Sequence, residues 1–160
     1  MSQPDSQAIP PLAGTPRALN VDVQLEYADR VNFAMQQYNV PLVARVAITN
    51  RGTETIPSLE VAISLDNGEC EPWSGRVDRI EPAATFSVEP EGLKLAAGRL
   101  ASRTEAERAN LRVEIVSPAG TASKSLPVDI LAFDQWPGVG HYPELLAAFA
   151  TPNHPKIAEI

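Results

Sequence analysis

The sequence predicts an all-β fold, an immunoglobulin-like antiparallel sandwich of two sheets with about seven to nine short strands. Three observations lead to this expectation. Apolar and polar residues alternate with period two in many short stretches between Leu19 and Phe133, which is typical of strands with one buried face. Turn residues separate these stretches at intervals of roughly 8–15 residues. Fifteen prolines against nine glycines disfavour long helices.

Length and composition predict one globular domain with tails. The chain has 160 residues, of which 44% are apolar and 21% are charged, which is the balance of a folded domain. Thirteen Lys and Arg against twenty Asp and Glu give a net charge of −7. Because a phosphate-binding surface is basic, this charge disfavours direct binding to nucleic acid. The apolar runs fall well short of the ~20 residues that cross a bilayer, so no membrane partner is expected.

Three segments are expected along the chain. Residues 1–17 are rich in proline and lack a targeting signal, which predicts a disordered leader. The single cysteine, Cys70, excludes an internal disulfide and agrees with a cytoplasmic location. Residues 18–134 should form the sandwich. Residues 135–160 should form a helical linker toward a missing downstream domain, because Asn153–Pro155 begins a helix that the chain does not complete.

The first half of the sandwich has the clearest strands. Leu19–Tyr27 alternates throughout and predicts a half-buried strand, and Val31–Met35 predicts a shorter, weaker one. Leu42–Ile48 and Leu59–Leu65 predict two further strands of similar length. Because the turn residues Thr49–Thr53 join them, we expect these two strands to be neighbours in one antiparallel sheet.

The middle of the sandwich is less regular. Trp73–Pro82 predicts a short edge strand. Ala84–Val88 predicts another, with Phe86 and Val88 pointing inward. Gly92–Leu95 adds a third short piece.

One short helix and two more strands follow. Thr104–Asn110 predicts a helix of one or two turns, because Thr104 and Glu107 have the spacing of a capping box. Leu111–Ile115 and Leu126–Ile130 alternate and predict strands. The region lacks the Cys–Trp–Cys framework of antibody domains, so we expect an immunoglobulin-like sandwich without the disulfide.

The end of the chain predicts a docking helix. Pro143–Ala150 begins with a proline in its first turn and carries an apolar stripe formed by Leu145, Leu146 and Phe149. A helix of this length is marginal in water on its own. We therefore expect it to dock, either on the sandwich near Trp136 or on the domain that follows.

The same region shows a family resemblance. Leu126–Gly138 followed by Pro143–Pro155 resembles the N-terminal region of very large bacterial helicase-like proteins with domains of unknown function. Glu71–Trp73 with Arg79–Ile80, and Thr104–Arg108, resemble that region too. The resemblance implies a transglutaminase-like region, superfamily-1-type helicase motifs and sometimes a nuclease further along the parent chain. It implies a role in DNA transactions or defence against foreign DNA, and assigns no chemistry to this segment.

Sequence motifs for catalysis are missing. The chain contains no G-x-x-x-x-G-K-[ST] loop, no G-x-S-x-G elbow and no H-E-x-x-H pair. Cys70 could pair with His141 or His154 as a nucleophile. The neighbouring Glu69 and Glu71 favour an unreactive loop thiol instead, because they raise the pKa of a thiol. The two histidines lack partners at ligand spacing, so no metal site is expected.

Other polar and aromatic residues have two interpretations each. The acidic turn with Asp66, Glu69 and Glu71 could hold Ca²⁺, but its spacing favours a solvated turn. Trp73 and Trp136 could anchor a partner or a sugar ring, although packing inside the domain is favoured. Basic residues in the middle third are interspersed with acidic ones and predict a solvated surface: Arg76, Arg79, Arg99, Arg103 and Arg108.

These observations predict a non-catalytic accessory or interaction domain without cofactors. Its partner would be the downstream domain of the same polypeptide or another protein, with docking residues among Trp73, Trp136 and the apolar stripe of the last helix. The alternative is a carbohydrate- or surface-binding sandwich. Helicase motifs beyond Ile160 in the reading frame would support the first hypothesis.

Overall fold

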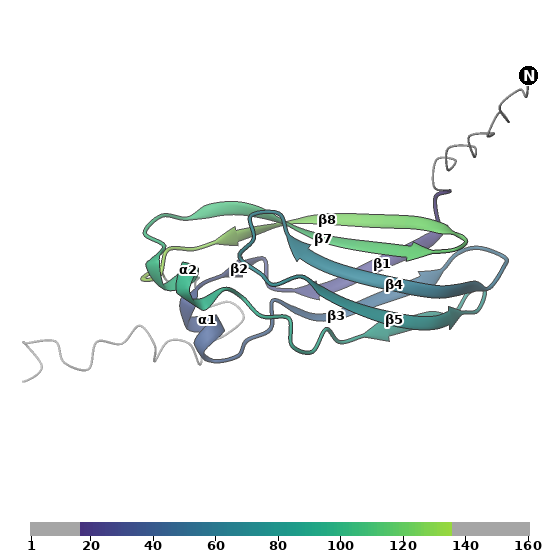
Figure 1. The fold of residues 1–160 in the computed structure, drawn as a ribbon, viewed down its shortest axis with the longest axis horizontal. Helices are drawn as coiled ribbons and strands as arrows, with labels where there is room; N and C mark the ends of the chain where they lie inside the picture. Colours follow the sequence, from purple (N-terminus) through teal and green to yellow (C-terminus); the bar gives the residue numbers. More distant parts are fainter. Residues whose placement is uncertain (1–16, 136–160) are drawn as a thin grey trace, which may run out of the picture.

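The computed structural model describes residues 17–135, which form a β-sandwich with two short helices at one end (Figure 1). The all-β, two-sheet fold that the sequence predicts is confirmed. The elements are β1 (Val21–Tyr27), β2 (Arg30–Val31), α1 (Phe33–Gln37), β3 (Val43–Asn50), β4 (Ile56–Leu65), β5 (Trp73–Ile80), β6 (Thr85–Val88), α2 (Ala97–Ser102), β7 (Glu107–Ser117) and β8 (Gly120–Ile130).

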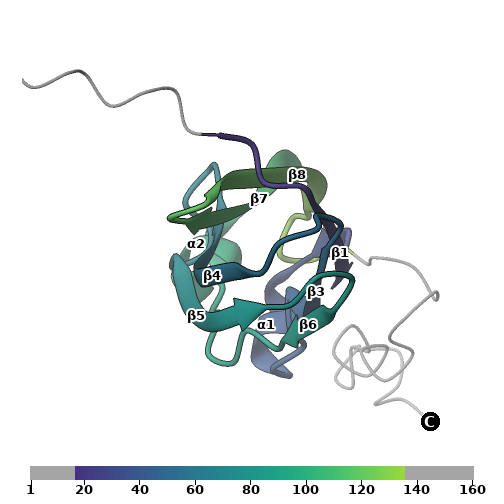
Figure 2. The same ribbon diagram turned by 90° about the vertical axis from the view of Figure 1, so that its right-hand side faces the viewer.

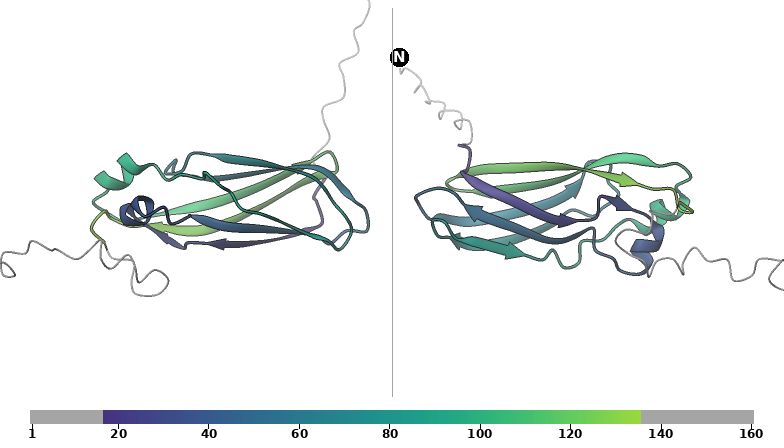
Figure 3. Two further views of the ribbon diagram at one scale, coloured as in Figure 1. Left: turned by 90° about the horizontal axis from the view of Figure 1, so that it is seen from below. Right: turned by 180° about the vertical axis from the view of Figure 1, so that it is seen from behind.

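The strands are divided between a three-stranded and a five-stranded sheet. The small sheet has the order β1-β3-β6 and the large sheet the order β2-β8-β7-β4-β5. Neighbouring strands are antiparallel, except that the two residues of β2 run parallel to β8. Figure 2 shows the two layers end-on, and Figure 3 shows both helices at the same end of the sandwich.

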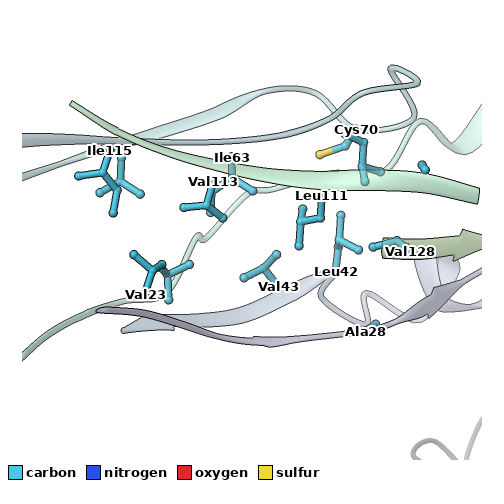
Figure 4. Packing of buried hydrophobic residues seen from close by; sticks show 14 of the residues in the cluster. Val23, Ala28, Leu42, Val43, Ile63, Cys70, Leu111, Val113, Ile115 and Val128 are labelled. Carbon is cyan, nitrogen blue, oxygen red and sulfur yellow. The ribbon is translucent and has the colours of Figure 1, made fainter. Parts of the chain in front are cut away.

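The core lies between the two layers and follows directly from the period-two pattern. In β4 and β7 the apolar residues at odd positions point inward, while their polar neighbours face solvent. Figure 4 shows side chains of the two layers facing one another across the core: Ile63, Leu111, Val113 and Ile115 from the large sheet, and Val23, Leu42 and Val43 from the small-sheet side. Each buried aliphatic side chain stabilises the fold by roughly 1.5–3 kcal/mol.

The first strand connects both sheets. Leu19 N–H donates to Thr121 O at 2.8 Å, so the chain enters beside β8. It then crosses to the small sheet, where β1 pairs with β3, and returns to β8 through β2. The side of the sandwich between β1 and β8 is therefore tied at both ends.

The expectation that Leu42–Ile48 and Leu59–Leu65 are sheet neighbours is wrong, because β3 and β4 belong to different sheets. The turn between them crosses from one layer to the other. Asn50, which is fully buried, holds this crossing: its Nδ2 donates to Glu54 O at 2.8 Å and Ile80 O at 3.0 Å. Gly52 N–H donates to Asn50 Oδ1 at 2.9 Å.

The helix predicted over Thr104–Asn110 is also wrong. The helix in this region, α2, ends at Ser102, and Glu107 already begins β7. The Glu107 carboxylate accepts from Arg103 at 2.7 Å, where a capping box would require the backbone of Thr104. The long β7–β8 ladder, which starts at the pair Glu107–Ile130, outweighs this local pattern.

Two weaker predictions need correction as well. Val31–Met35 is not a strand: after β2, the side chain of Asn32 accepts from Met35 N–H at 3.0 Å and caps α1. Gly92–Leu95 contributes a single bridge, between Leu95 and Cys70. Within residues 17–135, no helix has the length and hydrophobicity needed to span a membrane.

Candidate functional site

Trp73 packs within the domain. It lies at the start of β5, partly buried, and its Nε1–H donates to Glu91 O at 3.1 Å. The ring covers Gly75, where an added Cβ would lie 2.4 Å from it. This arrangement favours the packing interpretation of Trp73. The other predicted docking residues, Trp136, Leu145, Leu146 and Phe149, lie outside the described residues.

The Cys70 thiol is buried and unsuited to nucleophilic chemistry. Its side chain is 4% exposed. Burial, followed by the charge of Glu71, raises the pKa of Cys70 to about 11, so the thiol is protonated at neutral pH. His141 and His154, its possible partners, lie outside the described residues.

The sequence predicts a solvated acidic turn, and this prediction is wrong for one of its three residues, Glu69. Glu69 is fully buried and pairs with Arg103, with Arg99 Nε at 3.5 Å from the same oxygen. This pairing holds α2 to the β4–β5 loop. Across residues 17–135, no group of three or more His, Cys, Asp or Glu side chains could hold a metal ion.

The edge strands of the two sheets differ in how well they are protected against pairing with another chain. The end strands are β1 and β6 in the small sheet and β2 and β5 in the large one. Charged residues occur in β1, β2 and β5, a common protection of exposed strand edges. The sequence of β6 is Thr-Phe-Ser-Val, without charge or proline. We call β6 and its outward backbone groups the open edge.

Hydrogen bonds at the start of β6 show which backbone groups face outward. Asn50 N–H donates to Ala84 O at 3.0 Å, so the peptide groups of Asn50 point toward β6. In an antiparallel ladder this orientation repeats every second residue. The backbone groups of Phe86 and Val88 therefore point toward β3 and form the ladder hydrogen bonds with it. Thr85 and Ser87 therefore turn their N–H and C=O groups away from the sheet.

The open edge also exposes part of the core. Phe86 lies directly opposite Ile48 in the β3–β6 ladder, so both side chains are on the inner face. Ile48 is 0% exposed, whereas Phe86 is 38% exposed. Figure 2 shows β5 and β6 next to each other on this side, yet they belong to different sheets. The apolar interior thus reaches solvent beside unpaired backbone.

The opposite side of the sandwich is closed by side chains. Lys124 faces inward, opposite Val113, and its ammonium donates to the carbonyl of Val23 on β1. Pro127 on β8 has no N–H to offer, and its carbonyl lies 3.5 Å from the Tyr27 hydroxyl. Inward charges and prolines are features that prevent strand addition, and the open edge has neither.

A groove continues from the end of β6. Beyond the last pair, Val46–Val88, the register of the β3–β6 ladder would place Pro90 opposite Ala44. A proline has no N–H and cannot donate the next ladder hydrogen bond. The pairing ends there and leaves a groove of about 540 Å³, lined by Glu26, Pro41, Val43, Ala44, Arg45, Glu89, Pro90 and Glu91.

The inward orientation of Phe86 was predicted from the alternation, but its exposure was not. Exposure depends on β6 being the last strand of its sheet, which is set by long-range pairing with β3. The sequence feature that could have indicated an edge strand is the uncharged Thr-Phe-Ser-Val stretch between Glu81-Pro82 and Glu89-Pro90.

Comparisons with known proteins do not assign a family. No protein-family model matches the chain, and no curated protein sequence matches it. Among solved structures, the chain is similar to the crystal structure of YadV chaperone, with a TM-score of 0.40 and 14% identity. The match covers 75% of this chain and 55% of that one. A likeness this weak carries no argument about function.

Proposed function

We propose that this chain is a non-catalytic, immunoglobulin-like interaction domain that binds an extended segment of a partner protein along the open edge. The observation that carries the proposal is the uncharged end strand β6, whose outward backbone groups lie beside the half-exposed Phe86. Addition of a strand to a sheet edge is a recurrent mode of peptide recognition. The segment belongs to another protein or to a downstream domain of a larger, cytoplasmic helicase-like polypeptide, as the family resemblance implies.

The carbohydrate-binding alternative has less support. It requires an exposed aromatic platform, and the ring of Trp73 packs over Gly75.

The energetics indicate a weak interaction. Thr85 and Ser87 can form four backbone hydrogen bonds, each contributing a net ~0.5–1.5 kcal/mol. Covering the exposed part of Phe86 would add about 2 kcal/mol. Since association costs at least about 4 kcal/mol, the open edge supports transient binding, and tighter binding needs contacts beyond β6.

Peptide selection followed by edge-blocking variants tests the proposal. The purified chain is used to select binders from a displayed library of random peptides, and binding is measured for wild type and Ser87→Pro. The proline removes an outward N–H, so selected peptides should lose most of their affinity. Ser123→Pro is the matched control, because the same period places Ser123 on the outward edge of β8.

Two further measurements keep the test decisive. Phe86→Ser should weaken binding without altering the backbone edge, and peptide addition should shift the amide resonances of Thr85–Val88. Peptides that bind Ser87→Pro and Phe86→Ser as tightly as wild type would overturn the proposal, provided that both variants melt like the folded parent.

A further inference from the structure

We infer that the segment bound at the open edge carries basic residues beside its strand-forming stretch, at the end that lies next to Glu89 and Glu91. This inference rests on the proposed function and specifies the chemistry of the partner. It follows from the charges around the groove, from the course of that groove and from the net charge of the chain.

Two carboxylates at the end of β6 are uncompensated. Glu89 and Glu91 are exposed, and neither forms an ion pair within residues 17–135. The third acidic residue of the groove, Glu26, is neutralised by its ion pair with Arg45. The groove therefore presents a net negative charge just beyond the last backbone bonds that β6 can offer.

The groove provides space for a partner longer than β6. Ala44, which lines the groove, is exposed and is the extra residue of a bulge, because the β1–β3 register shifts from the pair Glu26–Arg45 to the pair Tyr27–Val43. A second hollow of about 430 Å³ continues past Glu91 and is lined by Val40, Leu93 and Lys94, among others. Lys94 forms no ion pair with Glu89 or Glu91 in the part of the chain that the structure describes.

Charge disfavours a second copy of this chain as the occupant. Two β6 strands would bond through their outward residues, Thr85 of one copy with Ser87 of the other. In that arrangement the exposed Glu89 and Glu91 of each copy lie next to a second chain of net charge −7. Like charges repel, whereas a basic segment of another protein is attracted.

Designed peptides test the inference. We would measure fluorescence anisotropy of a Thr-Val-Thr-Val-Thr peptide flanked, at either end, by two Lys, two Glu or two Gly residues. At low salt, at least one Lys-flanked peptide should bind about tenfold or more tightly than its Glu-flanked counterpart, and this preference should shrink as salt screens the charges. The better of the two Lys placements reports the strand direction.

Variants of the chain locate the effect. Glu89→Gln with Glu91→Gln should reduce the Lys preference to below about threefold. Glu60→Gln with Glu114→Gln is the matched control, because these exposed residues lie on the outer face of the large sheet. The control should leave the preference unchanged.

The outcomes separate the two proposals. Peptides that bind wild type without a charge preference, and lose affinity to Ser87→Pro, would overturn this inference and leave strand addition intact. Binding that survives Ser87→Pro would overturn both. A dimer of the free chain in light scattering that Ser87→Pro dissociates would show that a second copy is the occupant and would overturn the inference.

Discussion

The buried ion pair between Glu69 and Arg103 makes a sharp stability prediction. Glu69→Gln removes a carboxylate that is 0% exposed and leaves the Arg103 guanidinium, whose side chain is 15% exposed, without its main partner. Hydrogen bonding to Glu69 raises the pKa of Arg103 in the wild type. The guanidinium also stays charged in the variant, because an arginine is not deprotonated in proteins.

The expected loss can be bounded from the structure. Breaking a buried ion pair by removing one partner typically costs about 3–5 kcal/mol. Arg103 keeps Glu107 at 2.7 Å, and Arg99 is 56% exposed and can be solvated. We therefore expect Glu69→Gln to lower the free energy of unfolding by about 2–4 kcal/mol, a large part of the ~5–15 kcal/mol of a typical domain.

Urea unfolding followed by circular dichroism measures this loss. Glu105→Gln is the matched control, because Glu105 is exposed and forms no ion pair within the described residues, and it should change stability by less than about 0.5 kcal/mol. Glu69→Leu combined with Arg103→Met should recover most of the loss, since Glu69 Oε2 and Arg103 Nε lack hydrogen-bond partners in the described part of the chain. A loss below about 1 kcal/mol for Glu69→Gln would refute the reasoning.

Three further predictions concern other parts of the fold. Asn50→Ala should lower the free energy of unfolding by about 2–4 kcal/mol in urea titrations, because the carbonyls of Glu54 and Ile80 lose their donor; an unchanged midpoint would contradict this. Hydrogen bonds from the backbone and side chain of Asn110 lower the pKa of Asp66 from 3.8, so Asp66 stabilises the fold above about pH 5 and loses this effect as the pH falls through the lowered pKa. Melting temperatures of wild type and Asp66→Ala should accordingly differ at pH 6 and converge in acid, and a difference that is equal at both pH values would argue against the hydrogen bonds as its cause. At pH 8 the Cys70 thiol should react with a disulfide reagent far more slowly than in the unfolded chain, and immediate labelling of the native protein would show that it is not buried.

The strands could be predicted from sequence wherever local alternation and burial coincide. Leu59–Leu65 lies within β4, and Leu111–Ile115 lies within β7, because each has one face on the core and one in solvent. The same local reasoning failed at Thr104, where the pattern fits a helix cap but ladder pairing with β8 dominates.

Sheet assignment and the candidate site could not be predicted locally. The turn after Asn50 has the residues of a hairpin, yet the side chain of Asn50 bonds to Ile80, thirty positions further along the chain. The exposure of Phe86 likewise depends on which strands end each sheet. Such properties arise from pairings between distant segments, which alternation does not specify.

The crossing of the first strand between the two sheets has a kinetic consequence. Val23 and Lys124, joined across the closed side, are 101 positions apart in the chain, and β2 also needs β8 for its pairing. β1 and β2 therefore gain these contacts only after β8, the last strand of the described residues, has been synthesised, and the large sheet is complete only then. Contacts of such high sequence separation slow folding, and until they form, the β1 edge is available to other nascent chains. This topology makes late closure, rather than collapse of the core, the step at which folding and aggregation compete.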